Sequence, residues 1–152
     1  MRENFKFGLE RVRELREHTE AQAKEQLASS LNQRLRGAAM LAAASEELAA
    51  ASQAGRPQEG GTQNAADFVA HERWVQQLRR DQEAAALSLD RLDAEVDARR
   101  SALGDASRER EVLERLKQRR LAEHKAELER RETVTLDELA LTMHLRRAGG
   151  SR

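Results

Sequence analysis

The sequence has no cysteine, no tyrosine and a single proline, and only 3% of its residues are aromatic. Without cysteine the chain has neither disulfide bonds nor thiolate chemistry, which fits a reducing cytoplasm. The longest apolar run, residues 38–44, is far too short to cross a bilayer. The first residues also lack the apolar segment of a signal peptide. These absences argue against a secreted or membrane-inserted protein.

Motifs that carry chemistry are missing as well. The glycines near residue 60 do not form the GxxxxGK[ST] pattern of a phosphate-binding loop. His71 is followed by Glu72, but the second histidine that a zinc-binding helix needs four residues on is absent. We therefore predict no catalytic residue, no metal ligand and no cofactor. The formal net charge of +0 gives no overall attraction to nucleic acid or anionic lipid.

The chain is rich in charge and in helical periodicity. Charged residues make up 36% of the sequence, compared with about 25% in a typical globular domain. Between residues 75 and 106, steps of three and four alternate without a break, which is the a/d repeat of a coiled coil. A helix with one narrow apolar stripe needs a partner to cover it. The positions of this seam are Val75, Leu78, Gln82, Ala85, Leu89, Leu92, Val96, Arg99, Leu103 and Ala106.

The first third of the chain is the expected partner helix. Gly55 and Pro57 end it, and Asn64 is a candidate N-cap for the next helix. The sequence thus predicts an all-α fold, a single antiparallel coiled-coil hairpin over residues 1–152. Its predicted elements are a helix over 5–53, a turn over 54–64, a helix over 65–132, and a short helix or frayed tail over 133–152. The face expected to cover the seam comprises Phe5, Leu9, Val12, Leu15, Ala23, Leu27, Leu31, Leu35, Ala38, Ala42, Leu48 and Ala49.

Folding the chain back at the turn predicts a register. Val12 should lie opposite Ala106, and Phe5 opposite Leu113. After Ala106 the strict repeat should fail, because the next seam positions include Arg110 and Lys117.

Three features have both a structural and a functional interpretation. Arg99 and Arg110 fall on seam positions, where a polar residue often sets the register. Trp74 either packs beside the alanines or anchors a partner, since tryptophan is enriched at binding hot spots. The charge run over residues 108–120 is either a solvated face or a binding surface.

Two blocks near the ends of the chain carry a family resemblance. Residues 5–16, Phe-Lys-Phe-Gly-Leu-Glu-Arg-Val-Arg-Glu-Leu-Arg, are similar to an F-x-F-x-L-x-x-V-L-x-x-R opening. Residues 110–120, with 129–132 and 136–140, are similar to a matching C-terminal block. With the length and the hairpin organisation, these blocks resemble the FliJ family of bacterial flagellar export proteins. The resemblance covers nearly the whole chain.

The resemblance implies a non-enzymatic component of flagellar type III export, similar to the γ stalk of rotary ATPases. It implies three partners: a hexameric export ATPase that the chain enters and stimulates, the cytoplasmic side of the export gate, and export chaperones. It also implies a peripheral location at the inner face of the cell membrane, without membrane insertion. The implied ATPase-ring contacts are Arg110, Glu111, Arg115, Lys117, Arg119 and Arg120. The implied export-gate contacts are Trp74, Leu78 and Asp81.

Other classes of function stay open at this point. A stalk protein of injectisome type III secretion would look almost the same, and a generic coiled-coil scaffold would share the heptads. Nucleic-acid binding by residues 108–120 is disfavoured, because Glu109, Glu111 and Glu114 interrupt the basic run.

Overall fold

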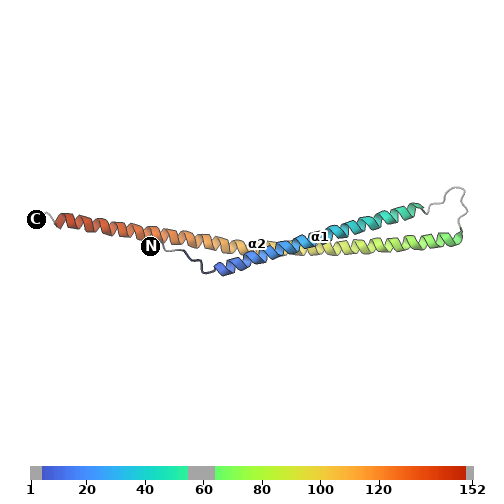
Figure 1. Cartoon of the computed structure of the whole chain (residues 1–152), viewed down its shortest axis with the longest axis horizontal. Helices are drawn as coiled ribbons and strands as arrows, with labels where there is room; N and C mark the ends of the chain where they lie inside the picture. Colours follow the sequence, from blue (N-terminus) through green and yellow to red (C-terminus); the bar gives the residue numbers. More distant parts are fainter. Residues whose placement is uncertain (1–4, 55–63, 150–152) are drawn as a thin grey trace. The chain divides into compact units, whose positions relative to one another are not determined.

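The computed structural model describes residues 5–54 and 64–149, which form two helices labelled in Figure 1. Helix α1 spans Glu10–Ala54 and helix α2 spans Ala65–Gly149. These described ranges contain no β-strand, so the all-α prediction with two packed helices is confirmed. Residues 55–63, most of the predicted turn, lie outside the described residues.

The packing forms two compact units, each described below by itself. Among the described residues, unit 1 combines the chain up to His18 with the chain from Ser107 onward. Unit 2 comprises the residues from Thr19 to Ala106. Each unit therefore contains a part of α1 and a part of α2 that run antiparallel.

Local hydrogen bonds explain where the helices begin. The N–H of Arg13 donates to the carbonyl of Leu9 at 2.9 Å, a bond of the α-helical type, so α1 starts at Glu10 and not at residue 5. The side chain of Asn64 accepts from the N–H of Ala66 at 3.3 Å, and its carbonyl accepts from Phe68 at 3.2 Å. Asn64 is therefore the N-cap of α2, as predicted.

The predicted helix end near Glu132 is wrong, because α2 continues through Gly149. The hydroxyl of Thr133 donates to the carbonyl of Glu129 at 2.9 Å, and that of Thr135 donates to Arg131 at 2.9 Å. These bonds to the preceding turn let threonine remain in a helix. The low helix propensity of threonine is a weak preference, and here it does not separate a short C-terminal helix from α2.

The seam predicted on α2 is confirmed. All ten of its positions are buried or half-buried, and Val75, Val96 and Ala106 are among the buried ones. Beyond Ala106 the seam continues further than expected, since Arg110, Leu113 and Lys117 are half-buried, and it is interrupted at Arg120, which is exposed. A polar side chain can hold a seam position when its charged end reaches a partner or the solvent.

The face predicted on α1 is only partly correct. Val12, Leu15 and Leu35 are exposed, so they do not cover the seam of α2. The inward face lies beside the predicted one and contains polar and small residues that meet α2. We call it the inner seam: Arg13, Arg16, Glu20, Ala23, Leu27, Ser30, Arg34, Gly37, Leu41, Ala44, Leu48 and Ala51, all buried or half-buried.

Polar contacts across the helices show that the predicted register is also wrong. In unit 2, Gln82 donates to the hydroxyl of Ser45 at 2.9 Å, and Arg99 donates to Gln26 at 2.8 Å. In unit 1, the ring of Phe5 lies 5.6 Å from that of His124 instead of opposite Leu113. The partners lie about one heptad or more further along α2 than expected. Because a heptad repeat matches itself after seven residues, its spacing does not select among such registers.

The register predicts the outcome of a cross-linking experiment. With Ser45→Cys and Gln82→Cys introduced together, a short bifunctional thiol reagent should link the two sites within one chain, because their side chains are in direct contact. The matched control, Ser45→Cys with Arg73→Cys, places the second thiol where the original register would require it and should react poorly. Links that form only between chains, or mainly in the control, would contradict the observed register.

Candidate functional site

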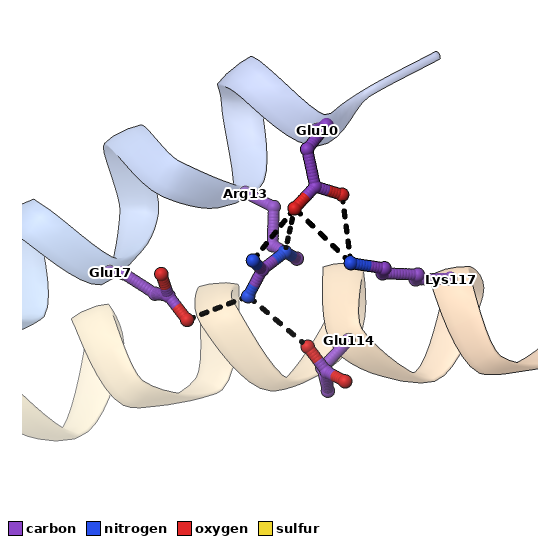
Figure 2. A network of polar contacts seen from close by, with 5 residues as sticks. All are labelled: Glu10, Arg13, Glu17, Glu114 and Lys117. Carbon is purple, nitrogen blue, oxygen red and sulfur yellow. Dashed lines mark hydrogen bonds and ion pairs between the residues drawn. The ribbon is translucent and has the colours of Figure 1, made fainter. Parts of the chain in front are cut away.

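A cluster of five charged side chains joins the two helices in unit 1 (Figure 2). Arg13 is at its centre, with nitrogens 2.7 Å from Glu10, 2.6 Å from Glu17 and 3.5 Å from Glu114. The ammonium of Lys117 lies 2.9 Å from the second oxygen of Glu10. The cluster therefore links α1 to α2 through Arg13–Glu114 and Glu10–Lys117.

These contacts hold the cluster in its charged form. The hydrogen bond from Arg13, followed by that from Lys117, lowers the pKa of Glu10 below its ordinary value, with partial burial acting in the opposite direction. The same hydrogen bond to Glu10 raises the pKa of Arg13. A carboxylate with a lowered pKa is a poor general base near neutral pH. The arrangement suits holding two helices together and does not suit proton transfer.

The cluster separates the predicted ring contacts into two groups. Lys117 is committed to Glu10, and Arg110 is half-buried along the seam. The other four residues are exposed, and where the structure records ion pairs for them, both partners belong to α2. Arg115 lies 3.5 Å from Glu111, and Arg119 lies 3.0 Å from Glu123. Arg120 is exposed, with no ion pair recorded among the described residues.

Exposed apolar side chains accompany these arginines in unit 1. Val112, three residues before Arg115, is 64% exposed, and Val12 and Leu15 are exposed on α1. The sequence predicted the two α1 residues to lie in the hairpin interface, so their exposure was not expected. Their signal was present in the periodicity, since α1 carries more apolar positions than one seam can bury.

The predicted gate contacts do not share one environment in unit 2. Trp74 is 47% exposed, and its ring lies 5.8 Å from that of His71 in an edge-on arrangement. Asp81 is exposed and accepts a hydrogen bond from Gln77 at 2.9 Å. Leu78 is 7% exposed and packs in a core cluster with Ala51 and Val75. Only Trp74 and Asp81 present a surface that another protein could contact.

The part of the chain that the structure describes holds no group of three metal-ligating side chains. None of its helices has a stretch long and apolar enough to cross a membrane.

The cluster predicts how stability depends on pH. Because the pKa of Glu10 is lowered in the folded chain, its contribution to stability is present above the unfolded pKa and is lost as the pH falls through the folded pKa. Glu10→Gln should therefore lower Tm by a few degrees at pH 7 and reduce the loss of Tm on acidification to pH 3. Glu14→Gln, an exposed carboxylate one turn further along α1, is the control and should leave both unchanged. Equal behaviour of the two variants in thermal melts would show that Glu10 contributes nothing to stability.

Comparison with known proteins gives a match to a family model. A search of curated proteins and a search of solved structures found nothing similar. The family model described as "Flagellar FliJ protein" matches residues 5–149, nearly the whole chain and both helices. The chain therefore belongs to the FliJ family and is a component of flagellar type III protein export.

Proposed function

We propose that this chain is the stalk of the export ATPase, with the exposed arginines of unit 1 as its contact with the ATPase ring. The observation that carries the proposal is the exposure of Arg115, Arg119 and Arg120. The first two pair only within α2 in the recorded ion pairs, at 3.5 and 3.0 Å. Exposed pairs of this kind contribute little to stability. Their charge is therefore available to an acidic surface of another protein.

Apolar surface beside the arginines supports the same contact. Val12 is exposed on α1 in unit 1, and Leu116 is half-buried on α2. Leu15 and Val112 extend the exposed apolar surface of the two helices. Apolar side chains combined with arginine are typical of protein-binding hot spots. We therefore propose that the ring contact consists of Glu111, Val112, Arg115, Arg119 and Arg120. Arg110 and Lys117 are left out of it.

The ring contact predicts a loss of ATPase stimulation. Arg115, Arg119 and Arg120 should be changed to glutamate together, leaving Arg110 and Lys117 in place because both are part of the hairpin packing. Glutamate has a helix propensity close to that of arginine, so helicity should be retained. ATP turnover by the cognate export ATPase should then lose most of its stimulation, by about tenfold or more, and residual binding should weaken with salt.

A matched control carries the same change of charge elsewhere. Arg73, Arg80 and Arg91 are exposed in unit 2 with no recorded ion pair among the described residues, and their change to glutamate should leave stimulation intact. Full stimulation by the first variant, shown to be helical, would remove the ring contact from unit 1. Equal loss in both variants would indicate a general effect of net charge.

We further propose that the exposed start of α2 contacts the cytoplasmic side of the export gate. Phe68, Val69 and Trp74 are exposed large apolar side chains within two turns, and Asp81 is exposed two turns beyond Trp74. Burial of a tryptophan against a partner is among the largest single contributions to protein binding. Export chaperones are the third expected partner, and together these contacts would hold the chain at the inner face of the cell membrane.

The gate contact predicts a selective loss of binding. Trp74→Ala should weaken binding to the cytoplasmic domain of the gate protein by tenfold or more, measured by calorimetry, and leave ATPase stimulation intact. Leu87→Ala removes another exposed side chain of α2 and should change neither property. Leu78→Ala is unsuitable as a test, because loss of a buried leucine costs about 2–5 kcal/mol of folding free energy. Undiminished binding by Trp74→Ala would exclude Trp74 as the anchor.

A further inference from the structure

Helix α1 carries a second heptad repeat beside the inner seam, each position one residue after an inner-seam position. Its spacing again alternates three and four without a break, and it lies wholly within unit 2. We call it the outer seam: Ala28, Leu31, Leu35, Ala38, Ala42, Ser45 and Ala49. A helix with two such repeats can pack against two helices at once, as helices in bundles do.

The outer seam is continuous with the α1–α2 interface. Leu31, Ala38 and Ser45 are half-buried at its edge, whereas Leu35 is 62% exposed, and the alanines at positions 28, 42 and 49 are also exposed. Three of the seven positions are thus partly covered by the packed hairpin, and the other four face outward. A third helix laid along it would extend the existing interface and would bury the exposed leucine.

The chemistry of this surface permits burial. Ser45 donates its hydroxyl hydrogen to the carbonyl of Leu41 at 2.8 Å and accepts from Gln82 at 2.9 Å. Its polar atom is therefore satisfied, and covering it leaves no unmade hydrogen bond. The alanines let another helix backbone approach closely, and large aliphatic side chains of that helix would fill the space above them.

Charge identifies the kind of helix that fits. The Arg34–Asp93 ion pair and the Ser45–Gln82 bond place residues 82–93 of α2 along one edge of the outer seam. Glu83 and Asp90 are exposed on this stretch, and Glu25 and Glu46 are exposed on α1. For these four carboxylates the structure records no ion pair among the described residues. Arg36 on α1 and Arg91 on α2 are exposed on the same stretches, so among these residues each bordering helix has one more carboxylate than cation and the surface is acidic on balance.

We propose that the outer seam docks an amphipathic α-helix of another protein, one with large aliphatic residues in its seam and lysine or arginine on its flanks. A second copy of this chain fits poorly, because a symmetric contact would bring acidic edge against acidic edge. This surface is separate in sequence from the exposed arginines of unit 1 and from Trp74. The chain would thereby bind a helical partner in addition to the ATPase ring and the export gate.

Two designed peptides of about three heptads test the proposal with the full chain. Both carry leucine at a and d, and they differ in having lysine or glutamate at e and g. Fluorescence anisotropy should show saturable binding of the lysine peptide, weakening with salt, and much weaker binding of the glutamate peptide. Glu83→Lys with Asp90→Lys should reverse this preference. Failure of the lysine peptide to bind, or equal binding of both peptides, would overturn the proposal.

A matched pair of variants places the binding on the outer seam. Leu35→Gln removes its exposed leucine and should weaken the lysine peptide about tenfold or more. Met40→Gln removes an equally exposed side chain, 68% exposed and outside the outer seam, and should leave binding unchanged. Circular dichroism should show both variants to be as helical as the wild type. Equal effects of the two changes would overturn the assignment to this face. If the chain self-associates without peptide, and Leu35→Gln abolishes this self-association, a second copy of the chain occupies the outer seam instead.

Discussion

Close approach of the two helices at Gly37 constrains how unit 2 packs. A Cβ atom added at this position would lie 2.6 Å from a terminal methyl of Leu92, so the methyl occupies the space that a larger residue would need. Leu89 is the other neighbour, at 3.7 Å. Small residues on α1 and leucines on α2 thus interlock, in the manner of knobs and holes. This contact holds α1 in the orientation in which Arg34 reaches Asp93 and Ser45 reaches Gln82.

The same orientation decides which side chains are left for partners. Turning the inner seam inward buries Glu20, Ser30 and the small residues, and it leaves Leu35 exposed. Apolar burial contributes little to the folding free energy of such a hairpin, because few of its large side chains are fully covered. Polar pairs across the interface then contribute to specificity of register more than to stability. The exposed apolar residues consequently lie on surfaces outside the α1–α2 interface.

Neighbouring charged residues of unit 1 make two kinds of contact. Lys117 and Arg13 hold the helices together through Glu10 and Glu114, whereas Arg115 and Arg119 make only exposed contacts within α2. In the sequence these cations look alike. Their roles separate because helical geometry turns residues two positions apart to different sides of α2. Family membership gives the export apparatus as the setting, and the exposed group is the one that we propose as the contact with the ATPase.

Much of this protein follows from the sequence by itself. The alternation of threes and fours from Val75 to Ala106 determined the seam of α2, because a 3.5-residue repeat has one geometric solution in a helix. Asn64 determined the start of α2, because a side-chain acceptor there meets an otherwise unpaired N–H. The end blocks pointed to the family that the comparison confirmed. What the sequence left undecided was which of two adjacent repeats on α1 faces α2, and in which register. Both repeats have helical spacing, and a shift of seven residues restores the pattern, so local periodicity cannot distinguish them. Only the tertiary contacts decided, through the fit of Gly37 beneath Leu92 and the pairing of Arg34 with Asp93.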